Sequence, residues 1–525
     1  MSQPTTLVLS DEVVAQIDAR LFGHFIEKCS WADEIGGDLL IDSTTHKPIP
    51  KAVELIKEMN IPMLRYPGGT DWDYHNWLEL IDNVPGKHVK RPAYYTRDNK
   101  TKVSDHRLGL NEFLSFCEDQ NIEPILVLNV GDPYFNKISI DSSVKHALAL
   151  YEYVNGNPQQ LNSKLNYNWA ALRQFNGRAK PFNVMYFEIG NEPWGFSKEM
   201  TIDKANKDSL LHYINCIKSI AKALKSRDSN LKILLDVTFK DLKDSKSQFG
   251  NYADFLVFHS YAPWDICYYN NSGTIIKNHK MKAEEIWKAW VTTPLIDPET
   301  GMTSYKNEWI VQMLEQSGLP IAVTEWNWNG WHQDKAAYNG NVAKGVGAAG
   351  YLHAFMRKGN IFKIANQSML IGKHWGINSI RVDQKKPYNI YMFPSGMVTA
   401  LYSKYHGDFL TNSEVKNNIY YSQPFEAHSI KPSPKVALFD IITTQSKNKI
   451  FIHVLSRSFK ETIPLNIDAS KIKFNGKGVM HELVPIDNDE LVKKVDTNIL
   501  YSNAKSFTIK IKPRTVNIIE LETND

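Results

Sequence analysis

Two glutamates stand at the ends of apolar segments, where a charged side chain is costly to bury unless it is paired or has a chemical role. Glu192 ends the segment 182–192 (FNVMYFEIGNE), and Glu325 lies near the end of 319–326 (LPIAVTEW). Two carboxyl groups about 5–5.5 Å apart can break a glycosidic bond with retention, because one attacks the anomeric carbon while the other protonates the leaving oxygen and then activates water. For either glutamate alone, an ion-paired residue at a strand end is the competing interpretation.

The elements that must bring these glutamates together follow a regular order along the chain. Eight apolar segments alternate with amphipathic segments of helical period. The apolar segments are 21–27, 61–69, 122–131, 182–192, 231–238, 253–261, 319–326 and 361–370. The segments of helical period include 52–60, 108–121, 142–154, 208–226 and 336–358. Because the apolar segments show no alternation with polar residues, they are typical of strands buried on both faces of a parallel sheet.

This order predicts an α/β fold, a (β/α)8 TIM barrel. An open doubly wound sheet is the alternative, but such a sheet more often carries a glycine-rich turn after its first strand, which this sequence lacks. Active sites of these barrels lie at the carboxyl ends of the strands. Glu192 on the fourth strand and Glu325 on the seventh are therefore expected to face each other across the barrel mouth. The amide of Asn191 would lie beside them, either to bind a sugar hydroxyl or to cap the backbone.

The pattern changes after about residue 385. The segment 391–405 still has helical periodicity, whereas the chain from Val436 onward consists of strand-like runs separated by turn residues, as in a β-sandwich of the jelly-roll kind. Residues 5–17 (TTLVLSDEVVAQI) also resemble strands that can join this sandwich. We therefore expect three parts: N-terminal strands in 1–16, a catalytic barrel in 17–385, and a linker helix with a C-terminal β-sandwich in 386–525.

Composition excludes several classes of protein. The 525 residues are 42% apolar and 22% charged with a formal net charge of +4, which is ordinary for a folded chain and favours neither nucleic acid nor a membrane as partner. The first residues lack a basic stretch followed by an apolar one, and no run of 18 apolar residues occurs, which favours a cytoplasmic protein. A secreted form that has lost its leader stays open.

No motif indicates a metal or a cofactor. Residues 345–350 (GVGAAG) fit the GxGxxG pattern, but they lie inside a segment of helical period, so we interpret the glycines as close-packing residues. HExxH, Walker A and GxSxG motifs are absent, and the 16 histidines show no metal-ligand spacing. Cys29, Cys117, Cys216 and Cys267 are far apart, so we expect neither a disulfide framework nor a thiolate zinc site.

Four short motifs, taken in order, resemble one known family. They are FGHFIE at 22–27, LRYPGG at 64–69, GNE at 190–192 and TEWN at 324–327. The Asn-Glu pair on the fourth strand and the Glu on the seventh are similar to those of the retaining glycoside hydrolases of clan A. Together the motifs resemble the α-L-arabinofuranosidases of glycoside hydrolase family 51. The resemblance continues through Gln367 and the segment 393–408, and the family also carries a trailing β-sandwich.

The resemblance implies a role for each matching residue. Glu192 would be the acid/base and Glu325 the nucleophile. His259 and Tyr261, in the segment FHSY, would line the sugar site, with Tyr261 orienting the nucleophile. Packing between loops is the alternative for these two side chains.

Further matching residues would hydrogen-bond the hydroxyls of a furanose ring. They are Glu27, Arg65, Asn191 and Gln367. The competing interpretation for Glu27 and Arg65 is an ion pair, which can also present fixed donors and acceptors to a sugar. For Gln367 the alternative is a hydrogen bond to the backbone of a loop.

Three segments near the expected substrate depart from the family pattern. Thr70 follows Pro-Gly-Gly where the family usually has Asn, and a hydroxyl cannot copy the paired donor and acceptor of an amide. Asp71 comes next, and it is expected either to contact a sugar hydroxyl or to cap a loop. Trp328 lies in the differing segment 327–331, and the loop 77–92 is longer than expected. Thr70, Asp71 and Trp328 are all placed near substrate by this reasoning, so the reaction type is better determined than the sugar.

Together these observations predict a retaining glycoside hydrolase that removes terminal α-L-arabinofuranosyl residues from oligo- or polysaccharides by double displacement. The expected partner is an arabinose-containing oligosaccharide or a related furanoside, and assembly into a homo-oligomer is open. Alternatives within clan A are a β-D-galactofuranosidase, a β-xylosidase and an endo-glucanase. A barrel that binds carbohydrate without catalysis is the alternative from another class, and the intact glutamate pair argues against it.

Overall fold

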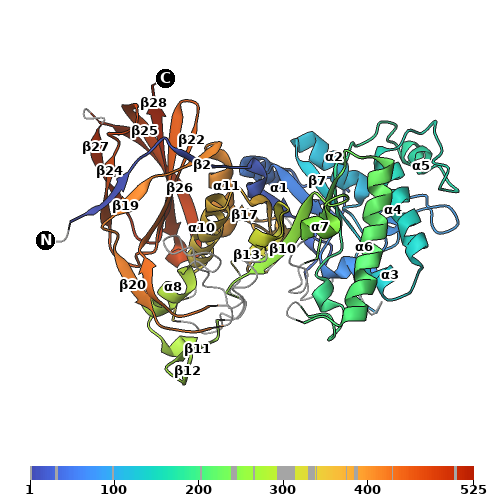
Figure 1. The fold of residues 1–525 in the computed structure, drawn as a ribbon, viewed down its shortest axis with the longest axis horizontal. Helices are drawn as coiled ribbons and strands as arrows, with labels where there is room; N and C mark the ends of the chain where they lie inside the picture. Colours follow the sequence, from blue (N-terminus) through green and yellow to red (C-terminus); the bar gives the residue numbers. More distant parts are fainter. Residues whose placement is uncertain are drawn as a thin grey trace.

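The computed structural model places a barrel and a β-sandwich side by side, joined by buried helices (Figure 1). It describes residues 3–29, 34–96, 100–201, 204–237, 245–263, 266–292, 314–328, 337–338, 340–373, 375–383, 388–427, 430–501 and 505–524. Within these ranges, no helix combines the length and the apolar character that crossing a membrane requires.

Eight parallel strands close into the barrel, in agreement with the predicted TIM-barrel fold. They are β3 (Gly23–Phe25), β4 (Met63–Tyr66), β7 (Glu123–Leu128), β8 (Tyr186–Ile189), β9 (Lys232–Leu235), β10 (Phe255–Tyr261), β13 (Ile321–Asn327) and β14 (Phe362–Gln367). Each strand overlaps one predicted apolar segment. A layer of inward-facing apolar side chains from β4, β7, β8, β9, β10, β13 and β14 fills the interior, so the barrel is a packed core.

Helices cover the outside of the barrel with their apolar faces. The longer ones are α1 (Pro50–Met59), α2 (Leu110–Gln120), α4 (Ile140–Asn155), α6 (Lys207–Arg227), α8 (Ala283–Val291), α10 (Val342–Arg357) and α11 (Pro394–Lys404). Shorter ones are α3 (Gly131–Tyr134), α5 (Trp169–Phe175) and α7 (Ser245–Phe249). In α1, for example, the buried residues Ala52, Leu55, Ile56 and Met59 recur at the spacing of one helical face.

Helix α10 is buried almost along its whole length, because the barrel lies on one side and the sandwich on the other. Its glycines allow this close approach. A Cβ atom on Gly347 would lie 1.9 Å from the Trp328 ring, and one on Gly345 would lie 3.1 Å from Pro394. The interpretation of the segment 345–350 as a packing motif is therefore confirmed.

Two sheets form the predicted C-terminal β-sandwich. The larger sheet runs in the order β2 (Val13–Gln16), β18 (Phe409–Thr411), β22 (Phe439–Ser446), β23 (Lys449–Ser456), β28 (Val516–Thr523), β25 (Phe474–Ile486) and β26 (Leu491–Leu500). The smaller sheet runs in the order β19 (Glu414–Lys416), β1 (Thr5–Val8), β24 (Ile463–Asp468) and β27 (Ser506–Ile511). Apolar side chains from both sheets make one core between them. The N-terminal segment thus contributes β2 to one sheet and β1 to the other.

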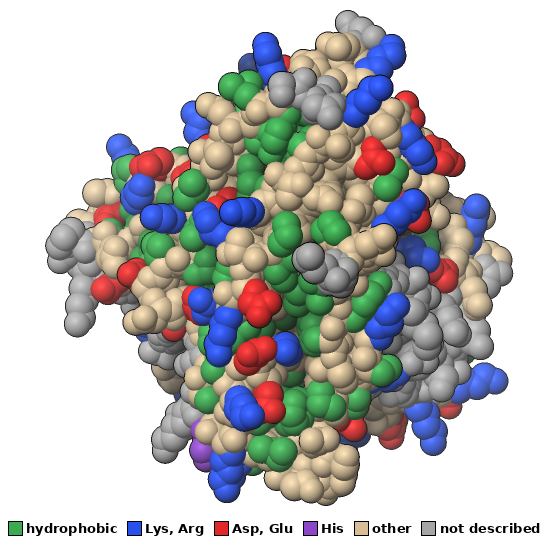
Figure 2. Space-filling model, turned by 90° about the vertical axis from the view of Figure 1, so that its left-hand side faces the viewer, with side chains coloured by type: hydrophobic (Ala, Val, Ile, Leu, Met, Phe, Trp, Pro, Cys, Tyr) green, Lys and Arg blue, Asp and Glu red, His purple; other side chains and the backbone are tan. Residues whose placement is uncertain are grey.

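The described side chains on the outer face of the sandwich are of mixed charge. Figure 2 shows Lys and Arg side chains interspersed with Asp and Glu over this face, with apolar side chains between them. This mixture agrees with the small net charge of the chain.

One predicted helix begins later than expected. Residues 390–392 form the strand β17 (Ile390–Met392), which joins β15 (Ile371–Gly372) and β16 (Ile380–Val382) in a small sheet. Helix α11 starts only at Pro394, a residue that favours the first turn of a helix because it lacks an N–H group. The prediction of a helix from 391 onward was wrong at its first residues, since the aromatic and apolar residues there pair as a strand.

Candidate active site

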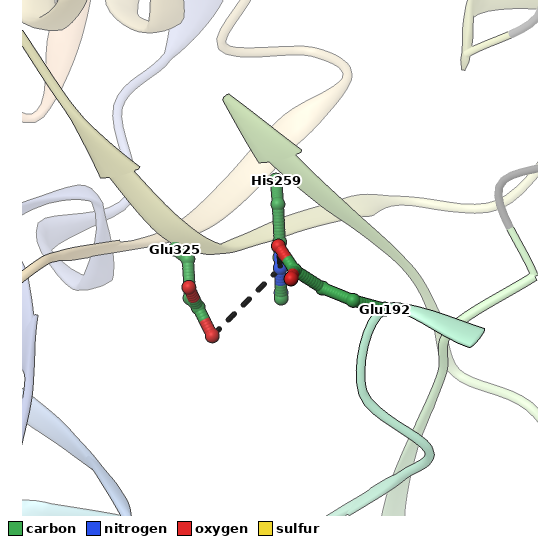
Figure 3. Close-up of side chains that lie close together, drawn as sticks. All are labelled: Glu192, His259 and Glu325. Atoms are coloured by element: carbon green, nitrogen blue, oxygen red, sulfur yellow. Dashed lines mark hydrogen bonds and ion pairs between the residues drawn. The ribbon is translucent and has the colours of Figure 1, made fainter. Parts of the chain in front are cut away.

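Three titratable side chains from distant parts of the chain converge at the carboxyl ends of the barrel strands (Figure 3). Glu325 lies on β13, His259 on β10, and Glu192 in the turn after β8. One polar atom of each lies within 4.8 Å of the others. The side chains of Glu192 and Glu325 are 18% and 8% exposed, so both are accessible from the barrel mouth.

The backbone after β8 turns sharply to present Glu192. The strand ends at Ile189, Gly190 has a φ of 89°, and Glu192 itself has a φ of 44°. Only glycine fits position 190, because a Cβ atom there would lie 2.2 Å from the Tyr213 hydroxyl. Pro193 then begins a short 3₁₀ helix, Pro193–Gly195. Glu192 therefore stands three residues beyond the strand that was expected to end with it.

The carboxylate of Glu325 is held by two donors. Arg65 Nη1 donates to Oε1 at 2.7 Å, and the Tyr261 hydroxyl donates to Oε2 at 2.8 Å. Burial alone would raise the pKa of Glu325, but the charges of His259 and Arg65 and these hydrogen bonds outweigh burial and lower the pKa. Glu325 is therefore ionised near neutral pH, as a carboxylate nucleophile must be.

Arg65 connects three acceptors at the floor of the site. Its Nε and Nη2 atoms donate to the two oxygens of Glu188 at 2.9 and 2.6 Å, which is a bidentate pair, and Nη2 also donates to Asn191 Oδ1 at 2.8 Å. The Asn191 Nδ2 atom is buried and has no hydrogen-bond partner among the described groups. A donor held this way can bind a hydroxyl group next to the reacting carbon.

Hydrogen bonds determine which nitrogen of His259 carries a proton. The Thr324 hydroxyl donates to Glu188 Oε1 at 3.2 Å, so its oxygen accepts from His259 Nε2–H at 2.9 Å. His259 Nδ1 then lies 3.0 Å from Glu192 Oε1, and a single proton bridges the two atoms. Burial lowers the pKa of His259, but the charges of Glu325 and Glu192 outweigh burial and raise it to about 9. His259 and Glu192 thus share one exchangeable proton.

Glu27 lies near Glu325 and Asp71. A Cβ atom on Gly69 would lie 2.7 Å from Glu27 Oε1 and 3.3 Å from Glu325 Oε1, so the glycine gives both carboxyl groups room. Burial, with the charges of Glu325 and Asp71, raises the pKa of Glu27 well above its usual value. The raised pKa favours the neutral form of the Glu27 carboxyl group, which can donate a hydrogen bond. Asp71 is buried and accepts a hydrogen bond from the Tyr94 hydroxyl at 3.0 Å.

The remaining predicted site residues lie in different surroundings. Thr70 is partly exposed and begins the 3₁₀ helix Thr70–Tyr74, next to Asp71. The structure does not bring Gln367 into the cluster, because its carbonyl accepts from Thr399 Oγ1 of α11 at 2.7 Å. Nor does it bring in Trp328, which is fully buried and donates to the carbonyl of Trp290 at 2.6 Å.

The alternation of a strand explains the position of Gln367. Successive side chains point to opposite faces, so when Gln367 contacts α11, its neighbour Ser368 points the other way. Because the Tyr261 proton goes to Glu325, the Ser368 hydroxyl donates to the Tyr261 oxygen at 2.8 Å and thus belongs to the cluster. The role of Gln367 in binding a sugar therefore stays a prediction.

Sequence reasoning also missed Glu188, Thr324 and Asp236. Glu188 and Thr324 interrupt otherwise apolar strands, and Asp236 follows the apolar run of β9 as Glu192 follows that of β8. The rule that selected Glu192, a charged residue after an apolar strand, would have selected Asp236 as well. Asp236 accepts from the backbone N–H of Glu192 at 2.7 Å.

Comparisons with known proteins find similarity to alpha-L-arabinofuranosidases. Residues 55–283 match the family model described as "Alpha-L-arabinofuranosidase 1 domain". A "Probable alpha-L-arabinofuranosidase C" of Aspergillus fumigatus is 31% identical over 237 residues, which are 44% of this chain and 41% of that protein. An "Intracellular exo-alpha-L-arabinofuranosidase" of Bacteroides ovatus is 27% identical over 201 residues, 37% of this chain and 35% of that protein. The matched region thus spans less than half the length of these curated relatives.

Solved structures extend the likeness of the fold to the whole chain. A family 51 alpha-L-arabinofuranosidase from Bifidobacterium longum has a TM-score of 0.74 at 17% identity and covers 100% of both chains. A GH51 alpha-L-arabinofuranosidase from Thermotoga petrophila has a TM-score of 0.70 at 19% identity and covers 98% of this chain and 99% of its own. The chain thus resembles the alpha-L-arabinofuranosidases of glycoside hydrolase family 51 in sequence over residues 55–283, and it shares their fold over almost its whole length.

Proposed function

We propose that the chain is a retaining glycoside hydrolase that removes terminal α-L-arabinofuranosyl residues from oligo- or polysaccharides. One observation carries the proposal: carboxylate oxygens of Glu192 and Glu325 lie within 4.8 Å of each other. The pair meets the short separation that double displacement requires and leaves no room for the water of an inverting enzyme between the carboxyl groups. The family match over residues 55–283 supports the sugar, because it names α-L-arabinofuranosidase.

In the first step, an oxygen of the ionised Glu325 attacks the anomeric carbon as the bond from this carbon to the leaving oxygen breaks. Glu192 gives its proton to the leaving oxygen, and the proton comes from the pair that Glu192 forms with His259 Nδ1. Arg65 and Tyr261 keep the Glu325 carboxylate in place for this attack. The product is a glycosyl ester on Glu325 and a free alcohol.

In the second step, Glu192 removes a proton from water, and the water oxygen attacks the same anomeric carbon. The ester bond to Glu325 breaks, and its carboxylate returns to the donors Arg65 and Tyr261. Two displacements at one carbon give overall retention of the anomeric configuration. Asn191 Nδ2 and the neutral carboxyl of Glu27 are the groups that we assign to the sugar hydroxyls, since both can donate.

A second candidate is the hydrolysis of a related furanoside such as a β-D-galactofuranoside. The observation behind it is the pair Thr70 and Asp71, which replaces the expected amide beside Glu27. A carboxylate there selects a different arrangement of hydroxyl groups than an amide does. The reaction at Glu192 and Glu325 would be the same for both sugars.

A panel of nitrophenyl glycosides, with NMR of the first-formed anomer, tests sugar and stereochemistry together. We expect release from the α-L-arabinofuranoside with retention, and much slower release from the β-D-galactofuranoside, β-D-xyloside and β-D-glucoside. Faster release from the galactofuranoside would favour the second candidate. Inversion at the anomeric carbon would contradict the proposed mechanism for either sugar.

We also propose a cytoplasmic location. The support is the word "Intracellular" in the name of the Bacteroides ovatus relative. Cell fractionation of the native host tests the location. Size-exclusion chromatography with light scattering tests whether the chain forms a homo-oligomer.

A further inference from the structure

The main chain of Glu192 is held at both of its polar groups, since the carbonyl accepts from the N–H of Gly195 at 2.8 Å and the N–H donates to a side chain. Its φ of 44° places it in the left-handed region, which a side chain other than glycine seldom adopts. The next residue, Pro193, has no N–H group to add. The backbone N–H of Glu192 donates to Asp236 Oδ2 at 2.7 Å, and this charge-assisted bond crosses from the turn after β8 to the end of β9.

Asp236 is itself rigidly placed. Its side chain is buried, its backbone N–H donates to the carbonyl of Ile189 at 3.3 Å, and its carbonyl accepts from the Tyr213 hydroxyl at 2.7 Å. Tyr213 also occupies the space above Gly190. A carboxylate that is fixed through its own main chain can fix the group that donates to it.

We propose that Asp236 is a positioning residue, whose carboxylate holds the backbone of Glu192 so that the Glu192 carboxyl group reaches the leaving oxygen. This inference rests on the proposed function, in which Glu192 is the acid/base. His259 holds the other end of the same residue, because its Nδ1 atom lies 3.0 Å from Glu192 Oε1. Glu192 is thus held at its main chain and at its carboxyl group by two different strands.

Several charged and titratable groups face Asp236. They are His259 from β10, Glu188 and Glu192 from β8 and its turn, Asp73 from the helix Thr70–Tyr74, and Tyr213 from α6. Burial, opposed by His259 and the Glu192 N–H, raises the pKa of Asp236 to about 6. Below that pH a neutral carboxyl group replaces the carboxylate, and its hydrogen bond to the Glu192 N–H weakens.

The decisive measurement is the dependence of kcat/KM on the leaving group for the purified full chain. A nitrophenyl arabinofuranoside needs little protonation of its leaving group, whereas a methyl arabinofuranoside needs a correctly placed acid. We expect Asp236→Ala to lower kcat/KM about 10- to 100-fold for the methyl glycoside, in line with the cost of a small misplacement. The loss with the nitrophenyl glycoside should be less than about 3-fold.

Asp236→Asn keeps an acceptor oxygen without the charge, so it should recover part of the loss. Because the amide resembles the neutral carboxyl group, D236N should also lack the part of the acid limb that titrates near pH 6. The matched control is Asp254→Ala, since Asp254 Oδ2 accepts from the N–H of Ile233 at 2.8 Å near the other end of β9. D254A should change kcat/KM by the same factor for the methyl and the nitrophenyl glycoside.

A double variant separates positioning from folding. In an E192A background, D236A should leave the nitrophenyl kcat/KM unchanged, because Asp236 acts through Glu192. Equal losses for both glycosides in D236A, or the same leaving-group effect in D254A, would overturn the inference and leave the proposed function intact. A wild-type chain without activity on any glycoside would overturn both.

Discussion

At the residue scale, the fork of Arg65 sets the charge and position of the groups around it. From a fully buried position, its Nε and Nη2 atoms donate to Glu188, Nη1 donates to Glu325, and Nη2 also donates to Asn191. The neighbouring Phe25 ring lies 4.5 Å from the guanidinium carbon and covers it on one side. A lysine has the charge but not the planar fork, so it cannot keep these contacts together.

We predict that Arg65→Lys lowers kcat at least about 100-fold, since a misplaced nucleophile is costly. Arg65 lowers the pKa of Glu325, so its loss should raise that pKa and move the acid limb of kcat/KM to higher pH. The measurement is the pH profile with the nitrophenyl arabinofuranoside.

The control for this prediction is Arg178→Lys, which removes a bidentate pair with Glu118 at the surface. R178K should keep the wild-type profile. An R65K profile with an unchanged acid limb would contradict the assigned role of Arg65.

The limits of sequence reasoning are clearest at this scale. Glu192 and Glu325 could be selected because each follows or ends an apolar strand, but Glu188 and Thr324 stand inside strands, where a single polar residue often only faces a neighbour. The sequence also could not tell in which direction a side chain points at the end of a strand. Gln367 and Ser368 are the example, since they contact different neighbours. Their directions depend on the register of β13 and β14, which is set by tertiary packing.

At the element scale, the turn after β8 places the Glu192 side chain in the candidate site. It combines a glycine and a glutamate of positive φ with a proline, under the hydroxyl of Tyr213 from α6. The eight strands and most helices could be predicted from apolar periodicity. The small sheet of β15, β16 and β17 could not, because its strands of two or three residues are too short to show a period.

We predict that Gly190→Ala destabilises the chain by about 1–3 kcal/mol, because an alanine at positive φ is strained and its Cβ would meet the Tyr213 hydroxyl. The change should also lower kcat at least about 10-fold by shifting Glu192. Denaturant unfolding and nitrophenyl kinetics measure the two effects.

Gly177→Ala is the matched control, since Gly177 has a φ of 95° but nothing within 4 Å of its hypothetical Cβ atom. G177A should cost about 1–2 kcal/mol, less than G190A, and keep kcat, as strain alone would. Equal effects of the two changes would show that the contact with Tyr213 does not hold the turn.

At the scale of the whole molecule, a buried ionic cluster joins the barrel to the sandwich. Asp440 of β22 accepts from His353 Nδ1 at 3.0 Å and from Arg457 Nη2 at 3.2 Å, and it also pairs with Arg357 of α10. His353 contacts the Tyr402 hydroxyl of α11 through its other nitrogen at 2.6 Å. The division into 1–16, 17–385 and 386–525 stays a prediction, and this cluster indicates that the barrel depends on the sandwich.

We predict that Asp440→Asn destabilises the folded chain by about 3 kcal/mol, because it leaves the buried Arg457 and the half-buried Arg357 with a neutral partner. Burial would raise the pKa of Asp440, but Arg357 and His353 outweigh burial and lower it well below its usual value. The ionised form therefore adds stability above the unfolded pKa, and this stability is lost as the pH falls toward the folded pKa.

Denaturant unfolding of wild type and D440N between pH 3 and 7 measures this difference, which should shrink at the acid end. Asp468→Asn is the control, since the pKa of Asp468 is also lowered but its carboxylate is exposed and accepts only locally from Ser470. A difference between wild type and D440N that stayed constant with pH would contradict a charged role for Asp440.

The central claim is that Glu325 bonds covalently to the sugar, while Glu192 gives a proton to the leaving oxygen and later removes one from water. In an E192A variant, a nitrophenyl arabinofuranoside should still form the glycosyl ester, but water should release it slowly because the base is missing. Rapid quenching followed by peptide mass spectrometry should then find one pentosyl group on the peptide that contains Glu325. Added azide should release it as the glycosyl azide. A pentosyl group on Glu27 or on another residue, or a burst of product without any adduct, would contradict the account.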